Sequence, residues 1–106
     1  MDIKAMNSSS FDALAISRMA SGHLCLSLSE HVSWEAFPNF ANLLLSGLGG
    51  RVKERLDGPE IRLWQVEFGS SAVRLVFDDY PLMVSLESSD TQGDSLLIKF
   101  HRDLSQ

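Results

Sequence analysis

His23 and Cys25 are residues of types that commonly bind metals or act in catalysis, and they lie close together in the sequence. They are two positions apart in a segment where leucines alternate with polar residues, so both face the same side of a predicted strand. An imidazole and a thiolate so placed could supply two zinc ligands, or a base beside a nucleophile. No second pair has metal-ligand spacing, and Cys25 is the only cysteine. We therefore expect no metal site, and interpret His23 as a surface histidine and Cys25 as a structural cysteine.

Two adjacent carboxylates, Asp78 and Asp79, could hold a cation or perform acid and base work. They precede Tyr80 and Pro81, and aspartate is favoured in turns because its side chain bonds the local backbone. We interpret the pair as turn residues. The sequence contains no nucleophile elbow, phosphate-binding loop or HExxH pair. These observations favour a non-enzymatic protein with no catalytic residues and no cofactor.

A concentration of positive charge occurs at Arg51, Lys53 and Arg55, which alternate along a predicted strand and would form a basic stripe on one side of it. Such a stripe could bind an acidic peptide or nucleic acid. The formal net charge of −5 and the pI near 5.0 disfavour nucleic acid and anionic membranes, which require net positive potential. Lysine and arginine on an exposed strand also prevent pairing at the edge of a sheet.

The composition is that of an ordinary globular domain, with 106 residues of which 44% are apolar and 22% are charged. We expect one domain over residues 11–106, preceded by a flexible, polar lead-in over residues 1–10. One cysteine allows no intramolecular disulfide, which indicates a reducing compartment. The first thirty residues have no basic start followed by an apolar run, so we expect neither a signal peptide nor a membrane span, and a cytoplasmic location.

A period near 3.6 in the apolar residues predicts one amphipathic helix over about residues 33–48. Ser33 can accept hydrogen bonds from the first turn, and the glycines from Gly47 to Gly50 supply a left-handed stop. Pro38 allows two interpretations. Either the first turn is distorted around the proline, or the regular helix begins near Phe37 with the proline at its favoured first position.

Apolar residues that alternate with polar ones predict the strands, including a short one within residues 11–18 and a well-defined one over residues 23–29. The downstream segments that alternate in the same way are 51–56, 60–68, 71–77, 82–86 and 96–100. Gly69 and Ser70 form a type II′ turn that pairs Phe68 with Ser71. The turn from Asp78 to Pro81 pairs Phe77 with Leu82.

These elements predict an α+β fold in which one helix packs on one face of an antiparallel, meander-like sheet of five to six strands, as a two-layer sandwich. The opposite, outer face would carry Leu63, Arg74, Val76 and Met83, a mixture of apolar and basic side chains. Apolar patches on a surface mark interaction sites more often than catalytic ones. Our leading hypothesis is a protein-interaction module, either a homodimer through this face or a sheet edge, or a module that binds another protein.

Two alternatives remain open on the sequence. A small ligand-binding domain or enzyme would have its pocket between the helix and the sheet, with His23 or Cys25 as a polar group. Weak binding of nucleic acid or an acidic peptide would use Arg51, Lys53 and Arg55.

Two short segments resemble a small family of bacterial proteins catalogued as a domain of unknown function. They are Ser33-Trp34-Glu35-Ala36-Phe37, before the glycines that end the helix, and Leu63-Trp64-Gln65-Val66-Glu67-Phe68. The similarity covers roughly residues 23–100. It implies a bacterial, cytoplasmic protein and no known activity.

Overall fold

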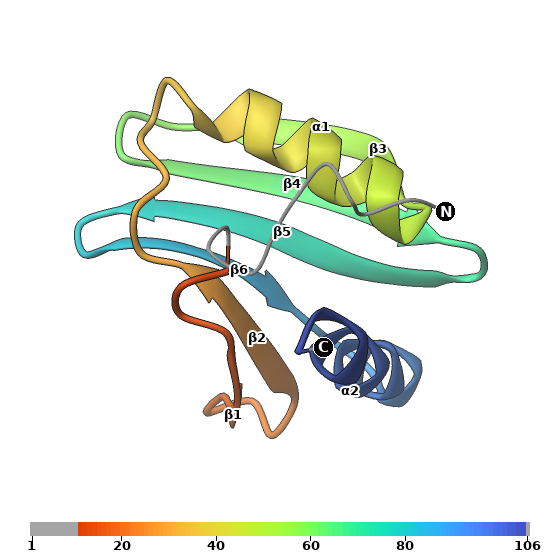
Figure 1. The fold of residues 1–106 in the computed structure, drawn as a ribbon. Helices are drawn as coiled ribbons and strands as arrows, with labels where there is room; N and C mark the ends of the chain where they lie inside the picture. Colours follow the sequence, from red (N-terminus) through yellow and green to blue (C-terminus); the bar gives the residue numbers. More distant parts are fainter. Residues whose placement is uncertain (1–10, 106) are drawn as a thin grey trace.

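The computed structural model describes residues 11–105, and the predicted lead-in over residues 1–10 lies outside the described part. An α+β fold of six strands and two helices is observed (Figure 1). In chain order the elements are β1 Ala15–Arg18, β2 Leu24–Ser29, α1 Phe37–Leu48, β3 Arg51–Asp57, β4 Ile61–Phe68, β5 Ser71–Asp79, β6 Leu82–Glu87 and α2 Thr91–Leu104.

The strands form one antiparallel sheet in the order β1-β2-β6-β5-β4-β3, so β3 to β6 are a meander and β2 pairs beside β6. The hairpin between β4 and β5 has the predicted register, with Phe68 opposite Ser71. Gly69 has a φ of 64°, whereas no described residue other than glycine has a positive φ. A positive φ at only the first of the two turn residues agrees with the predicted type II′ turn.

The connection between β5 and β6 is tighter than the sequence predicts. We expected a four-residue turn that pairs Phe77 with Leu82, but Phe77 lies opposite Val84 and only Tyr80 and Pro81 remain in the turn. The predicted register is therefore wrong by two residues, because strand pairing continues through the two aspartates. A shift of two residues preserves the alternation of side chains, so the same residues still face the core.

Helix α1 begins at Phe37, with Pro38 in its first two positions, so the second of the two interpretations of the proline is confirmed. A separate turn precedes the helix, in which the Ser33 side chain accepts a hydrogen bond from the Ala36 amide at 3.1 Å. Gly49 ends the helix with a φ of 81°, in the left-handed region where glycine has no steric penalty.

Helix α2 replaces the strand that we predicted over residues 96–100. The alternation of Leu96, Ile98 and Phe100 favours a strand, but Ile98 is 53% exposed in the structure. The buried positions instead recur at spacings of three and four, as one helix face requires. The buried residues of α2 are Gly93, Leu97, Phe100 and Leu104. The sheet therefore has two covering helices, and the prediction of one helix is wrong.

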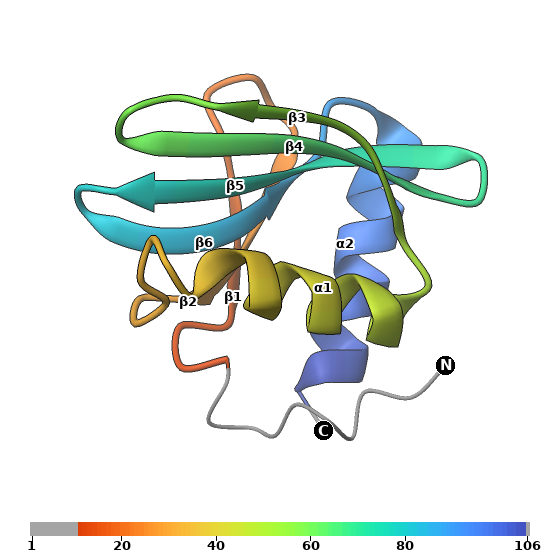
Figure 2. The same ribbon diagram turned by 90° about the horizontal axis from the view of Figure 1, so that it is seen from above.

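Both helices lie on the same side of the sheet, and they run in clearly different directions (Figure 2). Their buried residues join one hydrophobic cluster with the inward residues of the strands. Between α1 and the sheet, the ring of Phe37 lies 4.9 Å from that of Trp64 and 5.3 Å from that of Phe77. Aromatic rings thus occupy the space in which the alternative hypothesis placed a ligand pocket.

Arg62 lies on this inner face of the sheet and is largely buried. The guanidinium of Arg62 is centred 3.8 Å above the ring of Trp34, and it donates to the carboxylate of Asp57 at 3.0 Å. The second oxygen of Asp57 accepts a hydrogen bond from Trp64 Nε1 at 3.0 Å. Only 12% of the Arg62 side chain is exposed, so its positive charge is stabilised by these partners and not by water. These contacts hold Trp34, in the turn before α1, against the β3–β4 hairpin.

Candidate interaction surface

The outer face of the sheet is the face turned away from both helices, and it carries all four residues that we predicted for an interaction surface. Leu63 lies directly opposite Val76 on the neighbouring strand. Arg74 lies opposite Glu87, and their side chains form an ion pair at 3.3 Å. Met83 lies on the same face in β6. The register that the sequence predicts for β4 and β5 therefore places these residues correctly, and β6 keeps the correct face.

Two further apolar residues extend this surface at the β3–β4 hairpin. Leu56 is 56% exposed and lies opposite Leu63, and Ile61 is 41% exposed and lies two residues before it. Val76 is only 8% exposed. A regularly alternating strand with Arg51, Lys53 and Arg55 on its outer side would place Leu56 on the core side, so Leu56 was not among the surface residues predicted from the sequence. We name the group of Leu56, Ile61, Leu63, Val76 and Met83 the outer apolar cluster.

The cause of this error is a β-bulge in β3, where the register shifts between Val52 and Glu54. One extra residue reverses the alternation of side chains beyond the bulge. Arg55 consequently faces the core side, where its guanidinium lies 4.7 Å from the centroid of the Trp64 ring. The basic stripe of Arg51, Lys53 and Arg55 is therefore wrong as a surface, because the third residue lies on the other face.

The two remaining basic residues of that stripe share one carboxylate on the outer face. Arg51 lies 2.6 Å and Lys53 lies 3.5 Å from the oxygens of Glu67. The hydrogen bond from Arg51, with the positive charge of Lys53, holds the pKa of Glu67 below its usual value. A shallow hollow of about 280 Å³ lies beside them. It is lined by Lys53, Glu54, Gln65, Val66, Glu67 and Ala72.

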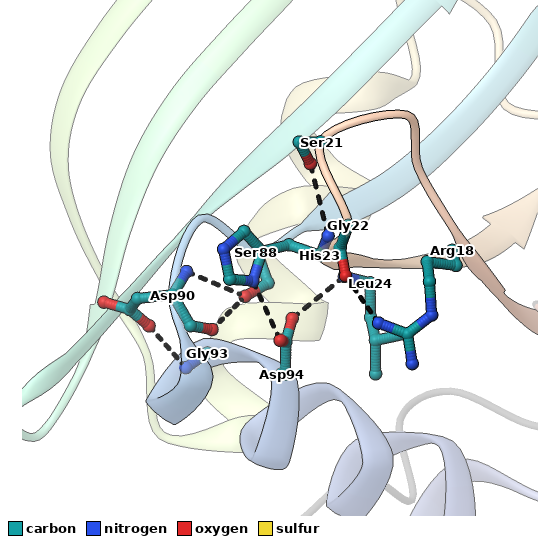
Figure 3. Close-up of polar contacts among 9 residues, drawn as sticks. All are labelled: Arg18, Ser21, Gly22, His23, Leu24, Ser88, Asp90, Gly93 and Asp94. Carbon is teal, nitrogen blue, oxygen red and sulfur yellow. Dashed lines mark hydrogen bonds and ion pairs between the residues drawn. The ribbon is translucent and has the colours of Figure 1, made fainter.

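His23 and Cys25, which could have formed a site together, have different partners in the structure. Burial raises the pKa of the Cys25 thiol, which favours its protonated form over the nucleophilic thiolate. His23 Nδ1 lies 2.9 Å from Asp94 Oδ2, in the first turn of α2 (Figure 3). The other oxygen of Asp94 accepts a hydrogen bond from the Leu24 amide at 2.9 Å. The 71 positions between His23 and Asp94 gave no local signal for this contact.

A histidine held by a carboxylate is also the arrangement that orients a catalytic base. The buried hydroxyl in this cluster, that of Ser88, donates to the Asp90 carbonyl at 2.8 Å, and Ser88 is 1% exposed (Figure 3). Asp90 in turn caps α2 by accepting from the Gly93 amide at 2.7 Å. The side chains of His23, Asp94, Ser88 and Asp90 therefore each have a hydrogen-bond partner that accounts for their position by structure alone. The cluster fixes the start of α2 against the start of β2.

This contact predicts a specific dependence of stability on pH. The hydrogen bond from His23, with that from the Leu24 amide, lowers the pKa of Asp94 from 3.8 to about 2. A lowered pKa stabilises the native state above the unfolded value, and this contribution disappears as pH falls through the folded value. We expect Asp94→Asn to lower the melting temperature relative to wild type at about pH 5, where the Asp94 carboxylate is charged in both states. The difference from wild type should shrink between 3.8 and about 2.

Thermal unfolding followed by circular dichroism at a series of pH values measures this difference. Asp79→Asn is the control, since Asp79 is exposed beside the β5–β6 turn. A difference between wild type and Asp94→Asn that stays constant down to pH 2 would contradict the prediction.

The structure places Asp78 and Asp79 at the end of β5 and not in the turn itself, because both residues pair with β6. Asp78 accepts a hydrogen bond from the Tyr80 amide at 3.3 Å, as expected of an aspartate that initiates a turn. Tyr80 itself is 90% exposed. Among residues 11–105, no helix is long and apolar enough to cross a membrane.

The fold and this surface define a class: a small two-layer α+β domain in which helices cover one face of the sheet and the other face carries an apolar cluster. A protein-family match over residues 14–106 identifies the particular family, described as protein of unknown function (DUF3630). The chain belongs to this family, which confirms the predicted resemblance to an uncharacterised family. No curated protein and no solved structure matches the chain.

Proposed function

We propose that this domain is a non-enzymatic protein-interaction module that binds another protein chain through the outer face of its sheet. We also propose that it works in the cytoplasm of a bacterium. The observation that carries the proposal is the exposure of Leu56 and Ile61, at 56% and 41%, beside Leu63 and Val76. Large apolar side chains that adjoin on one face lose unfavourable contact with water when a partner covers them.

The surroundings of the outer apolar cluster also support this proposal. Charged side chains flank it on the same face, and two ion pairs are formed there, Arg74 with Glu87 and Arg51 with Glu67. An apolar centre inside a polar margin is the usual composition of a protein interface. Paired charges reduce the cost of bringing a partner close, because fewer isolated charges lose their hydration.

The other two hypotheses receive less support. Nucleic acid requires several unpaired basic groups on one surface, but Arg51 and Lys53 share Glu67, and Arg55 lies on the core side. A ligand pocket between helix and sheet would occupy the space in which Phe37, Trp64 and Phe77 pack.

Photo-crosslinking in the source cells tests the proposed function. A photoreactive amino acid is placed at position 56 on the outer face or, as the matched control, at position 98. Ile98 is 53% exposed, close to the 56% of Leu56, but lies on α2 away from this surface. We expect a discrete crosslinked product from position 56 and none of the same mass from position 98. Equal products from both positions, or none from either, would contradict the proposal.

A further inference from the structure

We propose that the partner protein presents a basic, arginine-containing segment to the end of the sheet where the β3–β4 and β5–β6 turns lie. This inference rests on the proposed function and specifies the chemistry of the partner. Both turns lie at the same end of the sheet (Figures 1 and 2). We name this region the hairpin end, and it consists of Leu56, Glu60, Ile61, Asp78, Asp79 and Tyr80.

The two turns of the hairpin end are joined through the main chain. The Asp79 amide donates to the Glu60 carbonyl at 3.0 Å, and Asp78 lies opposite Ile61 on the neighbouring strand. Tyr80 follows directly, and its amide donates to the Asp78 carboxylate at 3.3 Å. Three carboxylates, one aromatic residue and one aliphatic residue therefore belong to adjacent chain segments.

The three carboxylates of the hairpin end have no cationic partner in the part of the chain that the structure describes. Glu60 and Asp79 are exposed and Asp78 is half-buried. None of the three forms an ion pair with a described lysine, arginine or histidine. A partner with positive charge therefore gains contacts here that the protein itself leaves unmade.

The arginines of the β3–β4 hairpin do not supply this positive charge. Arg62 is already paired with Asp57 at 3.0 Å, and only 12% of its side chain is exposed. Arg55 lies on the core side, with its guanidinium 4.7 Å from the centroid of the Trp64 ring. With Asp57 included, the two hairpins bring four carboxylates and two guanidinium groups to this end of the sheet, so negative charge remains in excess.

The apolar residues of the hairpin end favour arginine among the positively charged groups. Tyr80 is 90% exposed, and Leu56 and Ile61 are 56% and 41% exposed. A guanidinium can pair with a carboxylate while it stacks on an aromatic ring, and its alkyl stem can cover aliphatic side chains. The protein uses the same chemistry internally, where Arg62 lies 3.8 Å above an indole ring and donates to a carboxylate at 3.0 Å.

The charge of the whole chain favours the same partner. A formal net charge of −5 attracts a basic protein at long range and repels a second copy of this chain. The carboxylates of the hairpin end also repel the phosphates of nucleic acid. The overall charge and the local carboxylates therefore both favour a basic protein segment.

Titration of the isotope-labelled full chain with a probe peptide, followed by the NMR signals of its amides, tests the inference. The probe is a blocked pentapeptide in which arginine and leucine alternate, and the control peptide has glutamate in place of arginine. We expect the arginine peptide to shift the amides of residues 56–61 and 78–80 most, and the glutamate peptide to shift none of them. Added salt should weaken binding. Equal shifts around the exposed Glu54, away from the two turns, would overturn the inference.

Asp79→Lys should weaken binding of the arginine peptide at least about fivefold, because it replaces an attractive charge by a repulsive one. Glu60→Lys, in the other turn, is a second variant with the same expected loss. Asp103→Lys is the matched control, since it changes the net charge equally but lies on α2, where Asp103 pairs with Lys99. Equal weakening by Asp79→Lys and Asp103→Lys would indicate a response to net charge alone and overturn the inference.

The crosslink from position 56 separates this inference from the proposed function. We expect Asp79→Lys to reduce the crosslinked product at least about fivefold, and Asp103→Lys to leave it unchanged. A product that Asp79→Lys does not reduce would leave the proposed function standing without a basic partner. A product of twice the 11.8 kDa chain mass would identify a second copy as the partner and overturn the inference.

Discussion

Replacing Leu97 with alanine is expected to lower the free energy of unfolding by about 2–5 kcal/mol, the usual cost of removing a fully buried leucine side chain. Leu97 is 0% exposed and belongs to the hydrophobic core, where the buried face of α2 packs against the sheet. The alanine would leave a cavity that the rigid sheet cannot fill. Urea unfolding followed by circular dichroism gives the free energy and the slope with denaturant.

The matched control is Ile98→Ala, one position further along the same helix. Ile98 is 53% exposed, and alanine favours helix formation more than isoleucine does, so we expect a change of at most about 0.5 kcal/mol. The pair separates the two possible structures of this segment, because a strand with Ile98 in the core would reverse the order of the effects. A larger loss for Ile98→Ala than for Leu97→Ala would therefore contradict helix α2.

The second large effect is expected for Asp57→Ala, which should cost about 2–3 kcal/mol of unfolding free energy. This change removes the acceptor of both the Arg62 guanidinium and Trp64 Nε1. Trp64 is 3% exposed, so its donor has little access to water as a replacement partner. Leaving such a donor unpaired costs about 1–3 kcal/mol, and hydrogen bonds to charged groups contribute about 1.5–3 kcal/mol.

Asp57→Asn separates the two contacts, because an amide oxygen can still accept from Trp64 while the charge that pairs with Arg62 is lost. We expect the unfolding free energy of Asp57→Asn to lie between those of wild type and Asp57→Ala, measured by the same urea unfolding. Glu60→Ala, at an exposed position in the adjoining turn, controls for changes to the hairpin itself. An Asp57→Ala protein within about 0.5 kcal/mol of wild type would show that these bonds contribute little.

The parts of the fold that the sequence predicts well are those specified by neighbouring residues. The β4–β5 hairpin follows from the glycine at position 69 and from alternation on both sides of it, and its register is confirmed. The end of α1 follows from Gly49, since a left-handed residue stops a helix wherever the chain goes next. Helix α2 was missed because Leu96, Ile98 and Phe100 also fit a strand, and only packing selects the spacing of Leu97 and Phe100.

The surface depended more on tertiary structure than the core did. Leu63, Arg74, Val76 and Met83 reached the predicted face because strands β4 to β6 keep their alternation. The bulge in β3 places Leu56 on that face and Arg55 on the core side. The outer face therefore has an apolar cluster beside one ion-paired group, in place of the predicted basic stripe. No spacing in the sequence shows where a strand inserts an extra residue.

By itself, the sequence determined an α+β domain of an uncharacterised family, with an antiparallel sheet whose inner face is set by alternating apolar residues. Alternation and turn chemistry act over a few residues, so they can be read along the chain. The tertiary structure alone decided that α2 is a helix, that His23 contacts Asp94, and that Leu56 lies on the outer face in place of Arg55. These features depend on contacts between residues far apart in the chain, whose energies no local pattern contains.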